Sequence, residues 1–353
     1  RMIRVFLILT AVLCLLTTCC DDCKDCPVCP EPEPEEHLFY IMFMDPYGVC
    51  YVKPFSVEQN DFIDSIGTDQ RVVSMDIAGD NEYLLLSGMG GFEQIDLKTK
   101  EVVYENPAWG MIVEVSPDSR YFRVFDAGGK SHEIRRISDR SLVFRDTLPG
   151  MGGFSQDSRF YAYPRDIQDG TGLSELMIYD IPGDSVINKG IMHYWGDVPL
   201  YLLVVDIDSR NNKVFFAGSP GQALFLFSYD LENDVVNVVM PVPSGGLIFQ
   251  LDPNLDILYV TSLSHPPPGA IGDDSLYMFN TNTDDLIYTI ATTTVTWHHA
   301  PYCIAVSNDS RYICTSTLNY HDEGFVVYDA LYRVPLTYVR IPTHTALYAC
   351  TKK

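Results

Sequence analysis

The sequence predicts an all-β protein, and two observations indicate this fold class. Tyr (22) and Phe (18) are abundant among the 353 residues, Gly (24) and Pro (22) are frequent, and no long segment shows the apolar spacing of a helix. In addition, two different strand–turn–strand phrases alternate along most of the chain. Composition and repetition together favour many short, antiparallel strands.

The first phrase places a tight polar turn between two apolar strands. Asp, Asn, Ser and Pro occupy the turn, because they favour type I geometry and bond their own backbone. The flanking apolar runs are nearly continuous, as in strands that are covered on both faces. Three close copies span 112–125, 152–163 and 304–316, and looser copies span 73–88, 203–218 and 248–262.

The second phrase is another hairpin, centred on an acidic turn. Its copies span 92–105, 132–146, 176–189, 224–239, 276–290 and 325–339. The two phrases alternate six times, so each pair forms a four-stranded unit of roughly 38 to 55 residues, the size of a propeller blade.

The two ends of the chain complete a further blade. Segments 38–44, 48–55 and 61–66 supply three strands, and 344–350 supplies a single strand without a partner hairpin. Joining that C-terminal strand to the N-terminal blade removes two open sheet edges. The prediction is therefore a seven-bladed β-propeller over residues 37–353, closed by the C-terminal strand.

Particular phrases resemble the YVTN-type propeller repeats, relatives of the WD40 and NHL groups. The likeness covers about residues 38–350 and lies in Val115–Tyr121 (VSPDSRY), Tyr259–Ser262 (YVTS), Tyr179–Ile181 (YDI) and Tyr229–Leu231 (YDL). The sequence departs from the family at Ser262, where Asn is usual. The resemblance implies the fold, and it leaves function open because propellers serve as scaffolds, ligand binders and enzymes.

The N-terminus has the pattern of a secretory signal over residues 1–18. Arg1 and Arg4 precede an apolar run, Val5–Leu16, that is shorter than the about 20 residues of a membrane span. Leu16–Cys19 resembles a bacterial lipobox, which implies lipidation of Cys19. Plain secretion is the alternative.

Residues 19–36 are expected to form an extended, disordered Cys/Pro/Glu-rich tether. Prolines alternate with acidic residues there, so the backbone is stiff and self-repelling. Cys20, Cys23, Cys26 and Cys29 follow a C-x2-C spacing that thiolate metal sites also use. The sequence leaves open whether they are free, bridged or metal-bound, and an electron-transfer accessory role stays a third possibility.

Charge and missing motifs exclude several function classes. The formal net charge is −23, and no run of basic residues exists to contact phosphates, so a nucleic-acid partner is not expected. The sequence also lacks a nucleophile elbow, a phosphate-cradling glycine loop and a dinucleotide fingerprint.

The longer loops are expected on one face of the disc, and they hold the aromatic and histidine residues. Exposed loop aromatics often carry binding energy, although such rings also pack over blade ends. The predicted ligand-binding face comprises Trp109, His193, Tyr194, Trp195, His265, Trp297, His298, His299, Tyr320 and His321.

Two finer chemical hypotheses concern metals and cysteines. His298, His299, His321 and Asp322 could supply nitrogen and oxygen ligands for zinc or copper, although no H-x-H or H-x3-H spacing is present. Cys303 and Cys314 are placed symmetrically about Asn308 and Asp309, so the spacing predicts facing residues and a possible disulfide.

The resulting prediction is an exported, lipid-anchored propeller of the cell envelope, periplasmic or at the cell surface. It acts as a monomeric, non-catalytic binding or scaffold module for a protein or glycan partner, needs no cofactor, and contacts the membrane through its anchor only. The alternative is a metal-dependent enzyme or metal-binding protein that uses the His-rich loops.

Overall fold

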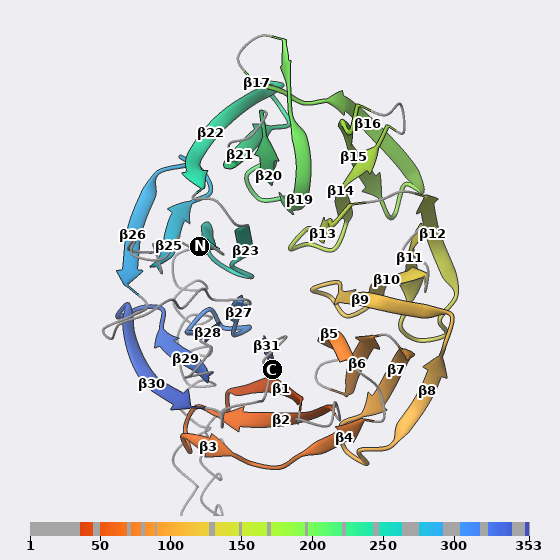
Figure 1. Ribbon diagram of the computed structural model, residues 1–353, viewed down its shortest axis with the longest axis vertical. Helices are drawn as coiled ribbons and strands as arrows, with labels where there is room; N and C mark the ends of the chain where they lie inside the picture. The colour runs from red at the N-terminus through yellow and green to blue at the C-terminus, as the bar shows by residue number, and fades with distance from the viewer. Residues whose placement is uncertain are drawn as a thin grey trace, which may run out of the picture. The chain divides into compact units, whose positions relative to one another are not determined.

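The computed structural model describes residues 36–44, 50–68, 72–78, 82–88, 90–126, 131–147, 150–167, 171–194, 197–220, 224–242, 247–262, 275–291, 304–317, 324–340 and 350–352. Every regular element within these ranges is a strand. None of the described residues form a helix long and apolar enough to cross a membrane. Residues His37–Lys353 form one compact unit, in which seven small antiparallel sheets surround a common centre (Figure 1).

Each sheet is one blade of a seven-bladed β-propeller, with its strands ordered from the innermost outward. Blade I contains β31 (Cys350–Lys352), β1 (Leu38–Met44), β2 (Cys50–Ser56) and β3 (Asp61–Phe62), and β4 (Ile66–Thr68) also pairs with β2. Blade II contains β5 (Val72–Ala78), β6 (Tyr83–Gly88), β7 (Gly91–Asp96) and β8 (Val102–Asn106). Blade III contains β9 (Trp109–Val115), β10 (Tyr121–Asp126), β11 (Ser131–Arg136) and β12 (Leu142–Thr147).

The remaining four blades follow the same order. Blade IV contains β13 (Gly153–Phe154), β14 (Phe160–Asp166), β15 (Ser174–Asp180) and β16 (Ser185–Ile191). Blade V contains β19 (Tyr201–Asp208), β20 (Lys213–Ser219), β21 (Leu224–Asp230) and β22 (Val235–Val242). Blade VI contains β23 (Leu247–Leu251), β24 (Ile257–Ser262), β25 (Ser275–Asn280) and β26 (Leu286–Ala291). Blade VII contains β27 (Ile304–Val306), β28 (Tyr312–Thr317), β29 (Gly324–Asp329) and β30 (Val334–Arg340).

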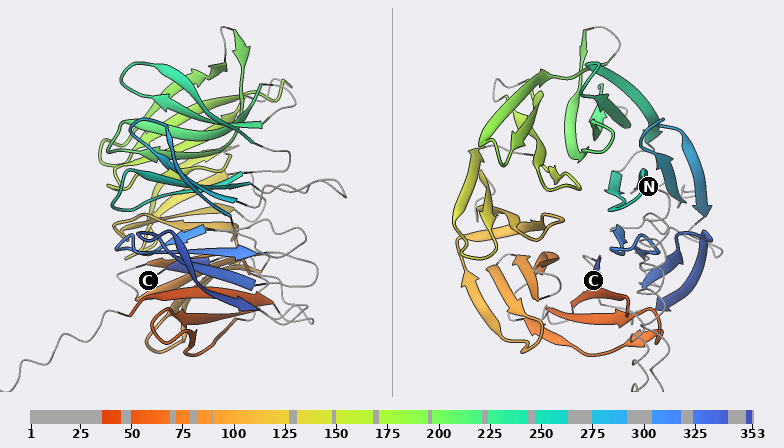
Figure 2. Two further views of the ribbon diagram at one scale, coloured as in Figure 1. Left: turned by 90° about the vertical axis from the view of Figure 1, so that its left-hand side faces the viewer. Right: turned by 180° about the vertical axis from the view of Figure 1, so that it is seen from behind.

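The core lies between neighbouring blades, which explains the near-continuous apolar runs. All six residues of β29 are buried, whereas the outer strand β30 is mostly exposed. One cluster joins Ala162 and Ile178 of blade IV to Val205 and Phe216 of blade V. The strands run across the thickness of the disc (Figure 2), so a middle strand buries side chains on both of its faces.

Closure by the C-terminal strand is confirmed, although that strand is Cys350–Lys352 and residues 344–349 of the predicted one lie outside the described residues. The C-terminal strand β31 pairs antiparallel with β1, and the register places Phe39 opposite Lys352 and Ile41 opposite Cys350. Strand β31 is thus the innermost strand of blade I, and the two ends of the propeller share one sheet.

A second link at this seam is His37, the first residue of the compact unit. Its Nδ1 lies 2.6 Å from Glu58 Oε1 in blade I, and its Nε2 lies 2.9 Å from Asp309 Oδ2 in blade VII. Its backbone N–H also donates to Glu58 Oε2 at 2.9 Å. The ring packs edge-on against Tyr312, so His37 connects the first blade to the last.

The three close copies of the first phrase form the same turn. Ser116 Oγ donates to Asp118 Oδ1 at 2.8 Å and accepts from the Tyr121 N–H at 3.0 Å. Ser119 then adopts a left-handed backbone with φ of 55°. The same bonds recur at 155–160 and at 307–312, so the Ser-x-Asp-Ser pattern encodes the turn directly.

This turn corrects the predicted register of the two cysteines. The Ser307 N–H donates to the Tyr312 carbonyl at 2.9 Å, so four residues lie in the loop, and Ser310 has a φ of 61°. Consequently Cys314 pairs with Ala305 and not with Cys303. The predicted register is wrong by two residues, because a four-residue turn replaces the tighter one assumed. Cys303 itself lies outside the described residues, as do Cys19 and the four tether cysteines.

Two other segments differ in detail from the expectation. The predicted strand 61–66 is divided into β3 and β4, both of which pair with β2. The connection between β16 and β19, which was expected to be one of the longer loops, contains an additional hairpin, in which β17 (His193–Tyr194) pairs with β18 (Val198–Pro199).

Candidate binding face

Strand order assigns each connection to one of two faces. Within a blade, the turn between the innermost and second strands and the turn between the third and outer strands lie on one face, which we call the turn face. The connections between second and third strands, and between blades, lie on the opposite face, which we call the loop face. This division follows from the antiparallel order of every sheet. The β17–β18 hairpin joins the outer strand of blade IV to the innermost strand of blade V, and so belongs to the loop face.

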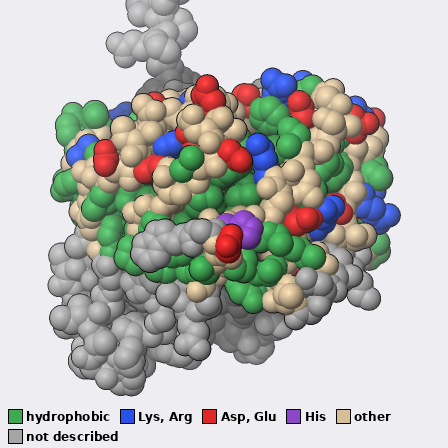
Figure 3. Space-filling view, turned by 90° about the horizontal axis from the view of Figure 1, so that it is seen from above, with side chains coloured by type: hydrophobic (Ala, Val, Ile, Leu, Met, Phe, Trp, Pro, Cys, Tyr) green, Lys and Arg blue, Asp and Glu red, His purple; other side chains and the backbone are tan. Residues whose placement is uncertain are grey.

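Exposed apolar residues gather on the loop face around this hairpin. Strand pairing places Val198 opposite Tyr194, and His193, which is exposed, opposite Pro199. Farther along the chain Tyr201 is exposed, and Leu203 exposes 51% of its surface. Figure 3 shows the edge of the disc that lies at the top of Figure 1, where apolar side chains and a histidine lie at the surface.

Blade IV extends the same surface. Met151 is exposed, and its carbonyl accepts the Val205 N–H at 3.0 Å, which fixes it beside β19. We call Met151, His193, Val198, Tyr201 and Leu203 the loop-face patch. On soluble proteins, large apolar side chains are exposed mostly one at a time. Several of them close together indicate an interaction site.

Two tyrosines, Tyr194 and Tyr201, hold the patch in place. The Tyr194 ring packs on Phe225 and Phe227, with centroids 5.9 and 5.5 Å away, and thereby attaches the hairpin to blade V. The Tyr201 hydroxyl donates to the Thr171 carbonyl at 2.8 Å. Gly172 has a φ of +74°, and a Cβ there would lie 2.9 Å from the Tyr201 ring. Glycine therefore lets the blade IV loop approach this ring.

The described part of the chain includes three of the ten predicted face residues. His193 and Tyr194 lie on the β17–β18 hairpin. The structure places Trp109 in the interior, with 6% of its surface exposed. Its ring packs against Phe92 and Phe122, and the Arg135 guanidinium lies 4.4 Å from its centroid. Trp109 therefore packs in the core and does not present its ring to a ligand.

The other predicted site residues lie outside the described residues, so their roles stay predictions. These are Trp195, His265, Trp297, His298, His299, Tyr320, His321 and Asp322. Among the residues that are described, no group of three or more His, Cys, Asp or Glu side chains is arranged to hold a metal ion. A zinc or copper site at the four metal candidates remains a prediction.

A cluster of carboxylates on the innermost strands was not predicted from the sequence. Asp76 Oδ2 accepts the Val115 N–H of the next blade at 2.8 Å, and Glu114 Oε1 accepts the Phe154 N–H of the blade after that at 3.2 Å. Asp206 lies against Gly153, where a Cβ would be 2.7 Å from its Oδ1. These carboxylates thus accept hydrogen bonds from backbone N–H groups at the inner edge of the neighbouring sheet, which have no partner strand there. In this way they connect successive blades.

Two of these carboxylates, Glu114 and Asp206, have raised pKa values and are therefore hard to ionise. Burial raises the pKa of Glu114, although the charge of Arg123 opposes that effect. Burial, together with the negative charge of Glu114, raises the pKa of Asp206 well above its usual value. Arg123 Nη2 lies 3.1 Å from Glu114 Oε2, and 3% of the Arg123 side chain is exposed. Among the described residues, the buried Arg123 is the cation that balances the centre of this cluster.

His132 lies beside Arg123 in an aromatic box. Its ring meets Tyr161 and Tyr163 edge to face, with centroids 5.3 and 4.7 Å away. Burial, and then the charge of Arg123, lower the pKa of His132 to about 3. It is therefore neutral at physiological pH. Within the described part of the chain neither ring nitrogen has a hydrogen-bond partner, and the edge-to-face geometry allows an N–H to point at a ring face.

The sequence does contain a weak signal for this cluster. Asp76, Glu114 and Asp206 each stand two residues before the inner turn, in strands that are mostly apolar. A repeated acidic residue at one position of a buried strand indicates a shared role. The partner backbone N–H groups lie about forty residues farther along the chain, so only the fold reveals them.

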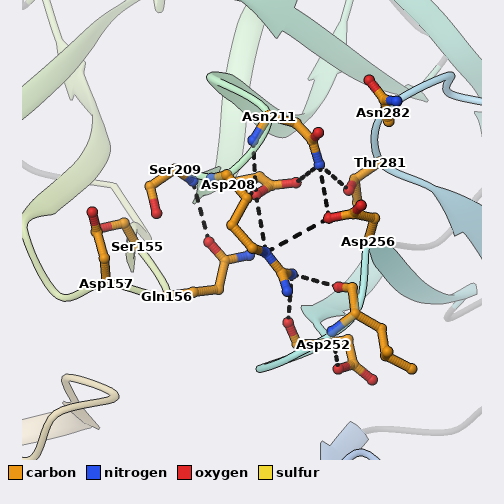
Figure 4. A network of polar contacts seen from close by, with 12 residues as sticks. Ser155, Gln156, Asp157, Asp208, Ser209, Asn211, Asp252, Asp256, Thr281 and Asn282 are labelled. Carbon is orange, nitrogen blue, oxygen red and sulfur yellow. Dashed lines mark hydrogen bonds and ion pairs between the residues drawn. The ribbon is translucent and has the colours of Figure 1, made fainter. Parts of the chain in front are cut away.

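On the turn face, a polar network joins blades IV, V and VI (Figure 4). The Ser209 N–H donates to Gln156 Oε1 at 3.2 Å, and Arg210 Nη2 donates to the Asp252 carbonyl at 2.9 Å. Asn211 Nδ2 donates to both Asp208 and Thr281. Apart from Gln156 Nε2, which has no hydrogen-bond partner among the described residues, the donors and acceptors shown are paired within the protein. The network therefore fits a structural role better than ligand binding.

Comparison with known proteins supports the fold. No family model and no curated protein matches the sequence. Among solved structures, the chain is similar to Kuenenia stuttgartiensis hydrazine synthase, with 13% identity and a TM-score of 0.57, covering 85% of this chain and 94% of that one. The β-propeller domain of Myceliophteria thermophila Cps50 (Swd1) has 12% identity and a TM-score of 0.57, with 78% and 88% covered.

A third similar structure is TolB from Acinetobacter baumannii, with 12% identity, a TM-score of 0.50, and 90% of this chain and 66% of that one covered. Identities this low establish a shared propeller fold alone. The fold is compatible with binding modules and with enzymes.

Proposed function

We propose that this chain is an exported, lipid-anchored propeller whose loop face binds a protein or glycan partner without catalysis. The loop-face patch is the observation that carries the proposal. Leu203 and Val198 keep apolar surface exposed in the folded protein, and His193 adds an exposed polar group on the same hairpin as Val198. Aromatic and aliphatic anchors next to hydrogen-bonding groups are typical of protein and carbohydrate recognition surfaces.

Rigid support of this patch favours binding. Tyr194 and Tyr201 attach it to blade V and to the blade IV loop through ring packing and a hydrogen bond. A surface that is already ordered loses less entropy on association. Trp195 follows Tyr194 directly in the sequence, and we include it in the proposed face.

The binding proposal is tested with a surface variant and a matched control. Val198→Ser with Leu203→Ser removes the exposed apolar anchors, whereas Val102→Ser with Val103→Ser removes comparable exposed valines on blade II. Both proteins are screened on a glycan array and by cross-linking in envelope fractions of the native cells. The proposal expects a specific signal that falls about tenfold in the first variant alone. Equal signals from both variants would contradict it.

Anchoring is tested separately. Cys19→Ser removes the proposed lipidation site and should move the protein from the membrane pellet to the soluble fraction. A Cys20→Ser variant controls for the loss of a thiol and should stay in the pellet. Intact-mass spectrometry of the wild-type N-terminus reads out the lipid directly. If Cys19→Ser leaves the distribution unchanged, plain secretion becomes the better explanation.

A further inference from the structure

The outer turns of the seven blades share one geometry and differ in chemistry. Each turn has four residues, and the fourth adopts a left-handed backbone with φ between 45° and 63°. These fourth residues are Asn60, Lys100, Arg140, Asp184, Asp234, Asp284 and Arg333. The common backbone allows the two middle residues of each turn to be compared directly.

In blades I to VI the two middle residues are small or polar. They are Glu58 and Gln59, Lys98 and Thr99, Ser138 and Asp139, Pro182 and Gly183, Glu232 and Asn233, and Asn282 and Thr283. In blade VII they are Leu331 and Tyr332, which expose 74% and 72% of their surface. No other large apolar side chain of the described residues is as exposed. The repeat is therefore broken at one turn, in favour of apolar surface.

The apolar surface continues onto the adjacent outer strands. Val334, Leu336 and Tyr338 alternate along β30 and are exposed, and so are Leu286 and Tyr288 on β26 of blade VI. The Arg333 guanidinium lies 4.9 Å from the Tyr288 ring centroid, which joins the two blades. We call these seven apolar residues, from Leu286 to Tyr338, the rim patch.

Two arginines flank the tip of this patch. The Ala330 N–H donates to the Arg311 carbonyl at 2.8 Å, which places Arg311 beside the turn. The contacts of the Arg311 and Arg333 guanidinium groups are aromatic rings, Tyr312 and Tyr288. Among the described residues neither guanidinium forms an ion pair, in a chain whose net charge is −23. Positive charge is thus left available at this site.

We propose that the rim patch rests on an anionic phospholipid bilayer, with Leu331 and Tyr332 entering the boundary between headgroups and acyl chains. Protein surfaces that contact the membrane interface typically combine leucine and tyrosine, which enter the lipid, with arginine, which is attracted to anionic headgroups. The tip projects into solvent, which suits a deformable lipid surface. Pro335 on the edge strand β30 removes a donor and disfavours addition of a partner strand.

The charge distribution and the position of the first propeller residue are both consistent with membrane contact at the rim patch. At physiological salt the Debye length is about 8 Å, so carboxylates on distant blades repel anionic lipid only weakly. His37, where the propeller begins, is bonded to Asp309 of blade VII. The inference rests on the proposed envelope location, and it adds a second membrane contact to the lipid anchor.

Vesicle binding tests the proposal without the anchor. The probe protein is residues 20–353, which lacks Cys19 and the apolar run but retains the whole compact unit. It is co-sedimented with vesicles of phosphatidylcholine alone and with vesicles that also contain phosphatidylglycerol. We expect binding to the second kind that weakens with salt. Leu331→Ser with Tyr332→Ser should lower partitioning about tenfold, because both apolar anchors are lost.

A matched control comes from the same turn in blade V. Glu232→Ser with Asn233→Ser changes an identical backbone position and should leave binding unchanged. Arg311→Gln with Arg333→Gln should remove the preference for phosphatidylglycerol. All variants should keep the wild-type melting temperature to within a few degrees. The altered side chains are exposed, except for the half-buried Arg333, and the Tyr332 N–H that donates to Asp329 belongs to the backbone.

Three results would overturn the proposal. The first is that the protein binds neither kind of vesicle, and the second is that the Leu331 and Tyr332 variant binds as well as the wild type. The third is self-association in light scattering that the same variant abolishes, since the patch would then be a protein interface. Partner binding at the loop face is measured on Val198 and Leu203, so failure of the vesicle test leaves the proposed function standing.

Discussion

His37 uses both ring nitrogens to join blade I to blade VII. Burial alone would lower the pKa of His37, but its hydrogen bonds to Glu58 and Asp309, with their charges, raise it above 6.5. Burial of Glu58 and Asp309 would raise their pKa values, yet bonding, including that to His37, lowers both. The three groups are therefore most stable as an imidazolium between two carboxylates.

This arrangement predicts a stability that depends on pH. The raised pKa of His37 means that its contribution is complete below 6.5 and is lost as the pH rises through the higher folded value. The lowered pKa values of Glu58 and Asp309 mean that their contribution is lost only as the pH falls through those values. His37→Gln should cost about 1–3 kcal/mol at pH 6 and less at pH 9. Urea unfolding at both pH values measures this cost, and an equal cost at each would contradict the proposed charge state of His37, Glu58 and Asp309.

At the scale of elements, the inner turn of blade VI depends on Asp252, which is fully buried. Its Oδ1 accepts the Asn254 and Leu255 N–H groups, and its Oδ2 accepts the Tyr259 hydroxyl at 3.0 Å. The Ser310 hydroxyl from blade VII also donates to it. One carboxylate therefore shapes its own turn and attaches the next blade.

Replacing this carboxylate should be costly. Asp252→Ala leaves two hydroxyls and two N–H groups without their acceptor, so we expect a loss of about 3 kcal/mol or more in unfolding free energy. Asp256→Ala, on the exposed side of the same turn, should cost about 1 kcal/mol or less. Chemical denaturation of both variants makes the comparison, and similar costs would refute the role assigned to Asp252.

The turns also show how far sequence alone reaches. Ser116, Asp118 and Ser119 carry their own hydrogen bonds, so the turn and its two strands could be predicted locally. The register of Cys314 could not, since one left-handed residue at Ser310 changes the loop length. Likewise Glu114 meets a backbone N–H of another blade, and no local pattern names that partner.

At the scale of the whole molecule, the repeated strand pattern of seven sheets is enough to predict the propeller from the sequence. The arrangement of residues on its loop face can be predicted only in part. Loop residues such as His193 have no periodic pattern that fixes their neighbours. Trp109 shows the difficulty, because a tryptophan beside a predicted connection is also a good core residue. Its burial against Phe92 follows from a neighbouring strand that the sequence does not point to.

Closure of the ring leads to the last prediction. Without β31 the inner edge of β1 loses its pairing, and the buried side chains Phe39 and Ile41 lose cover on that edge. A chain ending at Ala349 should lose about 3 kcal/mol or more, because several ladder hydrogen bonds disappear together. It should also be cut faster by protease near the seam.

A chain ending at Lys352 keeps β31 whole and is the matched control. Urea unfolding and limited proteolysis compare the two chains with the full-length protein. The shorter chain should still contain His37 and Asp309, whose bond can hold blades I and VII together only weakly on its own. An unchanged unfolding midpoint in the chain ending at Ala349 would mean that face-to-face packing of the blades, without strand closure, is enough to keep the ring intact.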